Sequence, residues 1–369
     1  MKEKKYKGLG LMSGSSLDGL DMAYCEFVIS AEQNIVDWQL LEVETIPFSK
    51  EWMEKLKNAP SLTGKELTKL DTELGRYFGI QSLIFIGKHK LEPQFISSHG
   101  HTVFHYPNEA FTLQIGSGAA IAAITGYPVM DDFRAQDIAL GGQGAPLAPI
   151  VDHYLFEESD ICLNLGGIAN LTAKTDAGYV AFDIGGANQV LNALVDPLGW
   201  PYDDGGCFAA AGELKEELLK QVNALEYFHQ PFPKSLGNDW VREKLLPIYE
   251  KYDCPIEDKL HTACVQLGNQ IAKDLAPILK KNKTYKMLTT GGGAFNDFLI
   301  KCITTATNKV GDLEVEIPDV KIIEYKEALL MALLGVLRLE NISTTFTSVT
   351  GARERAIGGA LHQGWRVKV

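Results

Sequence analysis

Residues 11–21 read LMSGSSLDGLD, and the turn at their centre decides how the first part of the chain folds. Apolar runs over residues 6–13 and 20–29 flank a short stretch of Ser, Asp and Gly, which is the pattern of two strands joined by a hairpin turn. Such a turn presents backbone N–H groups and hydroxyls, and both suit phosphate oxygens. We therefore interpret the following residues as a phosphate-binding turn: Ser13, Gly14, Ser15 and Ser16.

The same pattern returns about 150 residues later, at NLGG (residues 164–167). Strand-like runs over residues 161–165 and 170–174 flank this second turn, and further strand and then helices follow both hairpins. A period of this length is too long for a solenoid, so we interpret it as the duplication of an α/β lobe. The sequence therefore predicts two α/β lobes with a cleft between them. The predicted lobes are residues 1–130 plus 341–369 (lobe I) and residues 131–340 (lobe II).

Hydrophobic periodicity places the other elements. Residues 63–90 are expected to form a long helix, with Thr63 and Glu66 in a capping box. A buried strand over residues 94–98 is expected to lead into a loop that carries histidines, and a last strand over 320–323 to precede an apolar helix. Further helices are expected over residues 188–196, 208–228, 239–251 and 258–281.

Composition excludes several classes of protein. The 369 residues include 46% hydrophobic and 22% charged residues, which is ordinary for a globular protein and excludes a disordered or coiled-coil chain. The formal net charge of −12 disfavours nucleic acid and anionic membranes as partners. The longest apolar run, residues 328–337, is about half of what a membrane span needs. Six scattered cysteines without a CxxC pair predict free thiols in a reducing compartment, and hence a cytoplasmic protein.

Motifs of common nucleotide and hydrolase sites are missing. The chain has no GxxxxGK[ST] loop, no protein-kinase HRD or DFG set and no GxSxG elbow. A metal site at His99, His101 and His105 is conceivable, but histidines hydrogen-bonded in a loop are the favoured interpretation. Asp18 and Asp21 flank the first turn and are candidates to hold Mg²⁺ through water, whereas a turn cap is the alternative for each aspartate.

Eleven stretches of the chain follow one another in the order of a known family: LMSGSSLDGLD (11–21), HGHTV (99–103), TLQIG (112–116), DFR (132–134), GGQGAPL (141–147), LNLGGIANLT (163–172), FD (182–183), PKS (233–235), GGG (291–293), EA (327–328) and TGA (350–352). Taken together, these motifs resemble those of the anhydro-N-acetylmuramic acid kinase family. That family belongs to the actin/hexokinase/Hsp70-like superfamily of two-lobed phosphotransferases. The resemblance implies an actin-like ATPase (ribonuclease H-like) α/β fold, with two lobes, a duplicated core and a central cleft.

The sequence departs from the family pattern at four places. The family usually has Gln at the position of His101 and Thr at the position of Ser15. Its FDTGPGN segment is FDIGGAN here (residues 182–188), and its PKSTGRE segment is PKSLGND (residues 233–239). The phosphate turns are intact, so ATP use is expected, whereas the two altered segments are expected to bear on the choice of sugar.

The resemblance implies a reaction. ATP, with Mg²⁺, and water convert 1,6-anhydro-N-acetylmuramic acid into N-acetylmuramic acid 6-phosphate and ADP, which serves the recycling of cell-wall sugars. The resemblance implies that Asp183 is the base that activates water and that Glu327 is a carboxylate near the sugar. The alternatives are a helix cap for Asp183 and a helix N-terminal charge for Glu327. A homodimer is also implied.

The resemblance also assigns binding residues. Arg134 is a candidate to grip the lactyl carboxylate in a bidentate way, and a structural salt bridge is the alternative. The expected substrate-binding residues are His99, Gln114, Asp132, Arg134 and Asn188. The expected ATP- and phosphate-binding residues are Ser13, Gly14, Ser15, Ser16, Leu17, Asp18, Gly19, Leu20, Asp21, Asn164, Gly166, Gly167, Gly291, Gly292, Gly293 and Asn296.

Two other functions stay open at the level of sequence. A kinase for a different sugar is one, because the altered segments are candidates to line the pocket. A nucleotide-binding module without catalysis is the other, because a fold of this kind need not phosphorylate a small molecule. The partners expected are therefore ATP and a small amino sugar, with no nucleic acid and no membrane.

Overall fold

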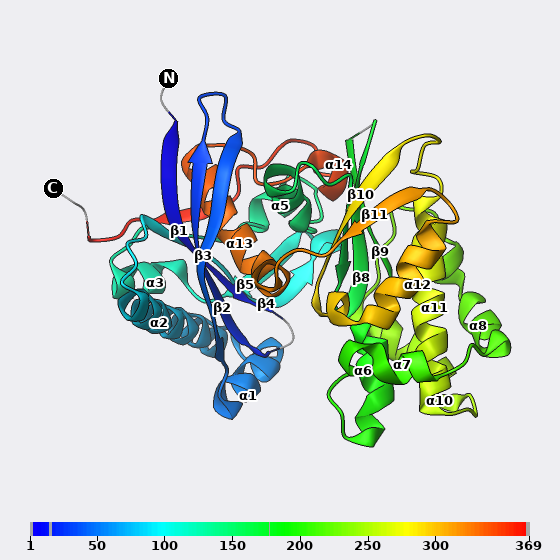
Figure 1. Cartoon of the computed structure of the whole chain (residues 1–369). Helices are drawn as coiled ribbons and strands as arrows, with labels where there is room; N and C mark the ends of the chain where they lie inside the picture. The colour runs from blue at the N-terminus through cyan, green and yellow to red at the C-terminus, as the bar shows by residue number, and fades with distance from the viewer. Residues whose placement is uncertain (1–2, 15–16, 177, 367–369) are drawn as a thin grey trace. The chain divides into compact units, whose positions relative to one another are not determined.

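The computed structural model describes residues 3–14, 17–176 and 178–366. The chain divides into two compact units. Unit 1 comprises Met1–Phe156 and Tyr325–Val369, and unit 2 comprises Glu157–Glu324. Each unit is an α/β structure with one mixed sheet, as Figure 1 shows.

The sheet of unit 1 begins with the predicted hairpin. Strand β1 pairs antiparallel with β2, and β2 pairs antiparallel with β3. On its other side β1 pairs parallel with β4, and β4 pairs parallel with β6. Within the described residues the strand order is β12-β6-β4-β1-β2-β3, with β5 paired to β4. The bounds are β1 Lys4–Ser13, β2 Gly19–Ile29, β3 Ile35–Pro47, β4 Phe95–Tyr106, β5 Phe111–Ile115, β6 Val129–Asp131 and β12 Ala360–His362.

Helices cover both faces of this sheet because side chains alternate along its strands. On β2, Leu20, Met22 and Tyr24 belong to the core formed with α1, α2 and α3, whereas Cys25 and Phe27 belong to the core formed with α5 and α13. Helix α2 begins at the predicted capping box of Thr63 and Glu66. The bounds are α1 Lys50–Asn58, η1 Ala59–Ser61, α2 Gly64–His89, η2 Pro107–Glu109, α3 Gly118–Thr125, α4 Ala135–Ala139, α5 Ala148–Leu155, α13 Val320–Leu339 and α14 Thr347–Thr350.

Strand β1 and helix α13 pack closely. A Cβ atom on Gly10 would lie 1.9 Å from the carbonyl oxygen of Ala328, so no larger residue fits at this position without a shift of backbone. Glycine there allows the helix to lie directly on the central strand. This contact fixes the start of the buried part of α13 beneath the first hairpin.

Unit 2 repeats the topology of unit 1. Strands β7, β8 and β9 form an antiparallel series, and β7 also pairs parallel with β10, which pairs parallel with β11. The order β11-β10-β7-β8-β9 matches β6-β4-β1-β2-β3 of unit 1 strand for strand. The prediction of an α/β fold with a duplicated core is confirmed. The bounds are β7 Ile161–Leu165, β8 Ile168–Thr175, β9 Gly178–Gly186, β10 Thr284–Thr290 and β11 Asp312–Glu316.

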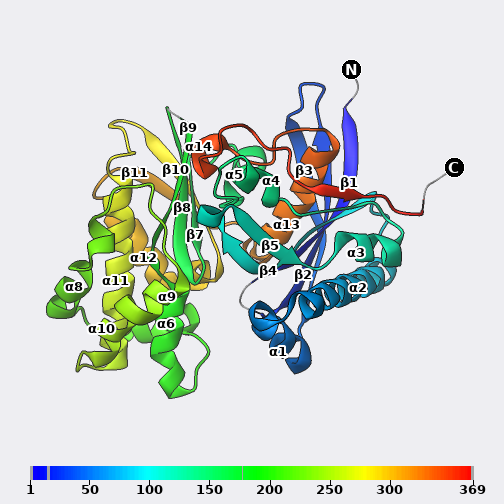
Figure 2. The same cartoon turned by 180° about the vertical axis from the view of Figure 1, so that it is seen from behind.

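The helices of unit 2 gather on one side of its sheet, as the view from behind also shows (Figure 2). Leu163, Phe182 and Ile184 of the sheet are buried in one core with Leu267 and Ile271 of α11. The bounds are α6 Asn188–Val195, η3 Asp196–Leu198, η4 Asp204–Gly206, α7 Cys207–Ala211, α8 Glu216–Asn223, η5 Glu226–His229, α9 Asn238–Trp240, η6 Val241–Leu245, α10 Leu246–Lys251, α11 Ile256–Leu275, η7 Gly292–Phe295 and α12 Asp297–Thr307.

The strand predicted over residues 320–323 was wrong, because α13 already begins at Val320. Asp319 starts this helix: its carboxylate accepts from the Lys321 N–H at 2.9 Å, and its carbonyl accepts from the N–H groups of Ile322 and Ile323. The last strand of unit 2 is β11, which lies before this point. Short apolar runs do not distinguish a strand from a buried helix, and here the cap decides.

The compact units divide the chain at other places than the predicted lobes. Residues 131–156 and the part of α13 from Tyr325 onward belong to unit 1. The reason is the core of unit 1, in which Ile150 and Val151 of α5 pack with the buried stretch of α13 that ends at Leu337. The backbone leaves the helical region at Tyr325, where the second division falls.

Two further predictions need correction. The helix expected over residues 208–228 is broken, because Gly212 lies against the carbonyl of Glu257 and the Glu213 N–H donates to Asp258 Oδ1 at 2.7 Å. These contacts bind the segment between α7 and α8 to α11. The histidines at 99, 101 and 105 lie on strand β4 and not in a loop.

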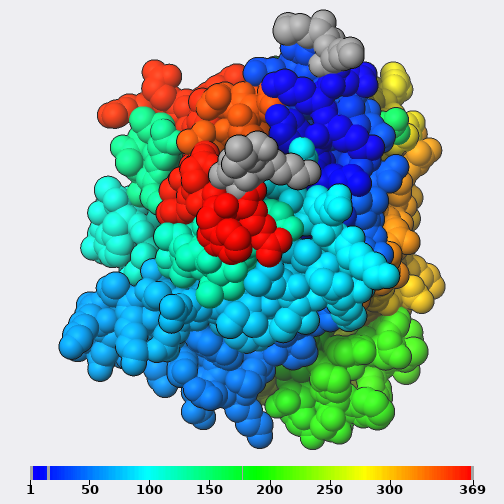
Figure 3. All heavy atoms as spheres, turned by 90° about the vertical axis from the view of Figure 1, so that its left-hand side faces the viewer, coloured from blue at the N-terminus to red at the C-terminus, as the bar shows by residue number. Residues whose placement is uncertain are grey.

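The C-terminal segment lies on the surface of unit 1, where Figure 3 shows it in red. The Trp365 indole donates to the Ala123 carbonyl at 3.0 Å, and the Arg366 N–H donates to the Gly126 carbonyl at 2.9 Å. All six cysteines lie in the described part of the chain and are free thiols. Among the described residues, no helix is both long and apolar enough to cross a membrane.

Candidate active site

The first predicted phosphate turn joins β1 to β2 in unit 1. Ser15 and Ser16 lie outside the described residues. Ser13 is buried at the end of β1, and the Leu17 N–H donates to the Gly14 carbonyl at 3.4 Å. Leu17 has φ of 61°, a left-handed conformation that is unfavourable for a bulky side chain and that often marks functional turns. Gly19 and Leu20 follow as buried residues of β2.

The two aspartates of this turn have different surroundings. Asp18 has an exposed side chain, and its carbonyl accepts from the Phe48 N–H at 3.2 Å. Asp21 is half-buried on β2, and its Oδ1 accepts from the Thr45 hydroxyl at 2.6 Å. In the part of the chain that the structure describes, no group of three or more His, Cys, Asp and Glu side chains is arranged to hold a metal ion.

His99 and Arg134 form a hydrogen-bonded pair. Arg134 Nε donates to His99 Nε2 at 3.0 Å, so His99 carries its proton on Nδ1, which lies 3.1 Å from the Gly100 carbonyl. Burial, together with the positive charge of Arg134, lowers the pKa of His99 to about 3. His99 is therefore neutral at physiological pH and serves as an acceptor that orients the guanidinium.

The other two histidines also have protein partners. Nδ1 of His101 lies 3.4 Å from Ser13 Oγ, and Nδ1 of His105 lies 3.2 Å from Thr112 Oγ1. Burial lowers the pKa of both side chains. Hydrogen-bonded histidines, the interpretation that the sequence favoured, are what the structure has, although a strand carries them.

Arg134 and Glu327 approach each other in unit 1. Arg134 Nη1 donates to the Gly144 carbonyl at 2.9 Å, and among the described residues no carboxylate oxygen lies within 4 Å of its guanidinium. Glu327 is solvent-accessible near the start of the buried part of α13. Desolvation by the surrounding protein raises the pKa of Glu327, and the negative charge of Asp21 raises it further. The positive charges of Arg134 and Lys326 lower this pKa. Arg134 thus retains donors that no structural salt bridge uses.

Two further residues expected at the sugar are Asp132 and Gln114. Asp132 lies two residues before Arg134, and Gln114 lies on strand β5 of the β4–β5 hairpin. Asp132 has φ of 56° and an exposed side chain, and desolvation with the neighbouring charge of Asp131 raises its pKa. Gln114 Nε2 donates to Thr112 Oγ1 at 2.8 Å, whereas its Oε1 is buried without a partner among the described residues. A buried, unpaired acceptor is unusual in a native structure and is compatible with a ligand site.

Asp137 is a residue that the sequence analysis missed. It is fully buried, and its carboxylate accepts from the Gly144 N–H at 2.8 Å and from the Thr350 hydroxyl at 2.9 Å. This carboxylate thereby ties the GGQG loop to the TGA segment more than 200 residues later, and the loop in turn gives Arg134 its Gly144 acceptor. No local pattern marks such a role, because both partners are backbone or distant in sequence.

A row of polar side chains crosses the sheet of unit 2. Thr290 of β10 pairs with Asn164 of β7, Asn164 pairs with Asn170 of β8, and Asn170 pairs with Asp183 of β9. Residues in register on neighbouring strands project from the same face. The Thr290 hydroxyl is buried without a partner among the described residues. Asn170 completes the row, although nothing in the sequence distinguishes it from the rest of its motif.

The glycines beside this row fall into two kinds. A Cβ on Gly291 or Gly293 would come within 2.6 to 2.7 Å of Asn164 or Leu165, so packing requires these two glycines. At Gly166, Gly167 and Gly292 the nearest atoms would lie at 3.4, 3.8 and 3.4 Å, and the backbone has no positive φ. The fold has room for a side chain at these three positions. Absence of a side chain there fits the close approach of a ligand to the backbone.

Two residues that were expected to bind ligands, Asn188 and Asn296, lie beside these glycines and also stabilise the fold. Asn188 begins α6, and its Nδ2 donates to the Leu165 carbonyl at 2.9 Å, which places it beside Gly292 and Gly293. Asn296 is buried and caps α12 by accepting from the Leu299 N–H at 2.9 Å. Thus Asn188, expected at the sugar, lies among the residues expected at the nucleotide.

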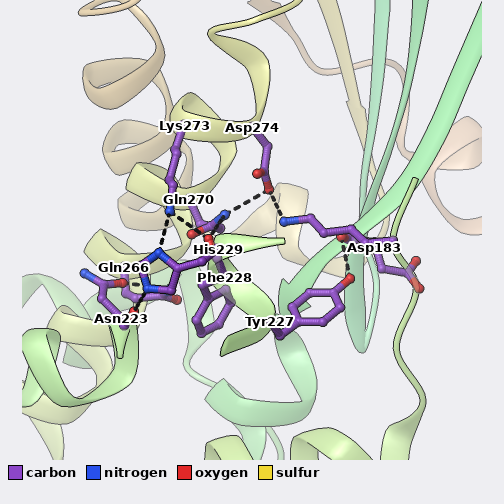
Figure 4. A network of polar contacts seen from close by, with 10 residues as sticks. Asp183, Asn223, Tyr227, Phe228, His229, Gln266, Gln270, Lys273 and Asp274 are labelled. Atoms are coloured by element: carbon purple, nitrogen blue, oxygen red, sulfur yellow. Dashed lines mark hydrogen bonds and ion pairs between the residues drawn. The ribbon is translucent and has the colours of Figure 1, made fainter. Parts of the chain in front are cut away.

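Asp183 is held on one side only. Its Oδ2 accepts from Ser235 Oγ at 2.8 Å and from the Leu236 N–H at 3.0 Å, whereas its Oδ1 has no partner among the described residues and is not enclosed. Figure 4 shows the carboxylate directed away from the Tyr227 ring. Burial raises the pKa of Asp183, and the two donors oppose this. Helix α6 has Ala187 at its N-cap position, so Asp183 is not its cap.

The first altered segment belongs mainly to the core. Ile184 and Ala187 are buried in the core of unit 2, and a Cβ on Gly185 or Gly186 would meet core side chains. In the second altered segment Leu236 is half-buried, whereas residues 237–239 are exposed. The residues at 184–187 therefore have packing partners in the core of unit 2.

One family of proteins matches nearly the whole chain. A family model described as anhydro-N-acetylmuramic acid kinase matches residues 6–364. The chain belongs to this family. An anhydro-N-acetylmuramic acid kinase from Francisella tularensis subsp. novicida (strain U112) is 34% identical over 391 residues, which cover 98% of this chain and 100% of that protein. One from Pasteurella multocida (strain Pm70) is 31% identical over 386 residues, with 98% of each protein covered.

The similarity to solved structures is weaker. Component A of the (R)-2-hydroxyglutaryl-CoA dehydratase of Acidaminococcus fermentans is 10% identical, with a TM-score of 0.44 and with 89% of this chain and 96% of that chain covered. The matches to members of the kinase family span nearly the whole chain, including both units, at more than 30% identity.

Proposed function

We propose that this protein is an ATP-dependent kinase that hydrolytically opens 1,6-anhydro-N-acetylmuramic acid and phosphorylates O6. Membership of the family supports the activity, and the environment of Asp183 carries the mechanism. One of its carboxylate oxygens is held by two donors, and the other is open. A carboxylate fixed in this way keeps its orientation and retains an oxygen that accepts a proton.

The proposed reaction consumes water and ATP. Asp183 takes a proton from water, the resulting hydroxyl bonds to C1, and the C1–O6 bond of the internal acetal breaks. O6 then forms a bond with the γ-phosphorus as the bond to ADP breaks, and the proton leaves Asp183 for solvent. The products are N-acetylmuramic acid 6-phosphate and ADP. A raised pKa makes Asp183 a stronger base than an exposed aspartate, which suits this role.

For the sugar, we propose roles for residues of unit 1. Arg134 binds the lactyl carboxylate, because its guanidinium has no carboxylate partner within 4 Å among the described residues and His99 fixes its orientation. Glu327 lies near the sugar as the second carboxylate, and the opposing charge of Arg134 acts on it. Gln114 contributes an acceptor that is unpaired among the described residues, and Asp132 contributes an exposed carboxylate to the same set.

For the nucleotide, we propose that backbone at the two hairpin turns and at residues 291–293 binds ATP. The tolerance of Gly166, Gly167 and Gly292 for a Cβ supports this, because their glycines are not needed for packing. Asp18 and Asp21 would hold Mg²⁺ through water, because Mg²⁺ keeps several of its waters and is often held by only one or two carboxylates. Bound there, Mg²⁺ would neutralise charge on the phosphates of ATP.

The setting of the enzyme is also part of the proposal. Six free cysteines fit a reducing compartment, and we propose a cytoplasmic enzyme that recycles cell-wall sugars. We further propose a homodimer, which the family resemblance implies. Light scattering on the purified protein measures its mass directly, and a mass near 40.6 kDa contradicts the dimer.

Release of ADP tests the proposed function. With ATP and 1,6-anhydro-N-acetylmuramic acid, ADP and N-acetylmuramic acid 6-phosphate should form in equal amounts, and little ADP should form without the sugar. Turnover with other hexoses alone would identify a kinase for a different sugar. Binding of ATP without turnover in any of these mixtures would identify a nucleotide-binding module.

A further inference from the structure

A buried ion pair lies behind Asp183 in unit 2. Lys234 belongs to the segment of residues 232–236, here called the strap, which runs between η5 and α9. The Lys234 ammonium is 2.8 Å from Asp274 Oδ2 of α11, and the side chains of both residues are almost fully buried. Gln270 Nε2 donates to the same oxygen at 3.0 Å, and Figure 4 draws this network. The ammonium also lies 5.1 Å from the centre of the Tyr227 ring.

The strap holds Asp183 by both its backbone and its side chain. The Asp183 N–H donates to the Lys234 carbonyl at 3.0 Å, and the next two residues, Ser235 and Leu236, donate to its carboxylate. On the other side, the Tyr227 hydroxyl donates to the Asp183 carbonyl at 2.8 Å. Asp183 and Asp274 therefore both hold the same short segment: Asp183 contacts residues 234–236, and Asp274 binds the Lys234 side chain.

We propose that the Lys234–Asp274 ion pair is a positioning device that locks the strap and thereby holds Asp183 in the orientation in which it accepts a proton. The inference deepens the proposed function and rests on it. A buried ion pair of this kind adds little net stability, because desolvation of both charges offsets their attraction. Its effect is to fix geometry. Asp274 on α11 holds the Lys234 side chain in place, and the strap in turn holds Asp183 on β9. Asp274 and Gln270 lie outside the stretches of sequence that resemble the family, whereas Lys234 lies in the stretch PKS (233–235).

Loosening the strap has two consequences for Asp183. Its carboxylate loses a fixed orientation, so kcat falls while KM for ATP and for the sugar stays nearly constant. It also loses two donors that stabilise the charged form, so its pKa rises and the acid limb of the kcat profile moves to higher pH. Of the titratable and charged groups around the strap that the structure describes, Tyr227 on η5 contacts Asp183, whereas Lys234 on the strap and Asp274 on α11 pair with each other.

The test compares pH profiles of kcat for three variants with that of the full-length enzyme. Ser235→Ala removes one donor at an exposed position, so folding is unaffected. Lys234→Met combined with Asp274→Leu replaces the ion pair by apolar side chains and leaves no buried charge unpaired. Lys215→Met is the control, because it breaks an ion pair to Asp258 on the same helix α11 but away from the strap.

We expect kcat to fall about tenfold or more in Ser235→Ala and in the double variant, with the acid limb at higher pH in both and with unchanged KM values. The control should match the parent enzyme. A folded double variant with the parent kcat and pH profile would overturn the inference, and so would a control that shifts equally. Full activity of Asp183→Asn would instead refute the base on which the inference rests, so the two failures are distinguishable.

Discussion

At the scale of single residues, Asp183 has an oxygen that the fold leaves open, so its substitution separates proton transfer from shape. Asp183→Asn keeps the size of the side chain but offers no carboxylate to take a proton from water. Turnover should drop by about 10²–10⁴-fold, the usual size of general-base help, while binding of ATP and sugar changes little. Steady-state kinetics and calorimetry measure the two effects. An active Asn variant would transfer the role of base to another group, with Glu327 the next candidate.

Arg134 allows a second test at this scale. Arg134→Lys keeps the charge but loses the planar donors and the bond to His99 Nε2. KM for 1,6-anhydro-N-acetylmuramic acid should rise by about 10–100-fold, the loss expected for a hydrogen bond between charged groups. The analogue 1,6-anhydro-N-acetylglucosamine lacks the lactyl carboxylate, so its KM should change far less. Arg76→Lys on the exposed face of α2 is the matched control. Equal changes for both sugars would refute the role of Arg134.

At the scale of elements, three glycines in the turns of unit 2 have enough space around them for a side chain. Gly292→Ala adds a methyl group whose nearest neighbour would be 3.4 Å away, so the protein should keep its melting temperature. If the nucleotide lies on this backbone, the methyl group collides with it and the Kd for ATP rises about tenfold or more. Gly87→Ala on α2, also with free space, is the control and should bind ATP normally. Unchanged affinity in Gly292→Ala would remove residues 291–293 from the nucleotide site.

Sequence and structure agree at this scale where the signal is local. The hairpin of β1 and β2, the hairpin of β7 and β8 and the capping box of α2 all follow from patterns within a few residues. The start of α13 was missed because VKII at 320–323 has the composition of a strand, and only the Asp319 cap shows otherwise. Asp137 and Asp274 were not predicted as site residues because their partners are distant in the sequence. Asp274, for example, pairs with a lysine 40 residues away.

At the scale of the whole molecule, the duplication was visible in the sequence but the divisions of the chain were not. Two hairpins about 150 residues apart indicate a repeated core without specifying which helices belong to which copy. Helix α5 and the part of α13 from Tyr325 onward belong to unit 1 because their apolar faces complete its core, and this depends on packing that no local pattern encodes. Candidate site residues fall in both units: Arg134 and Glu327 in unit 1, and Asp183 in unit 2.

The central claim is that water attacks the anomeric carbon and that the sugar's own O6 receives the phosphoryl group. The most direct measurement is turnover in ¹⁸O-labelled water, with the products analysed by mass spectrometry and ³¹P NMR. Unlabelled product kept in the same water corrects for exchange at C1. We predict one heavy oxygen at C1 of N-acetylmuramic acid 6-phosphate and none in the transferred phosphate. Label in the phosphate would contradict the account, because water would then have attacked phosphorus.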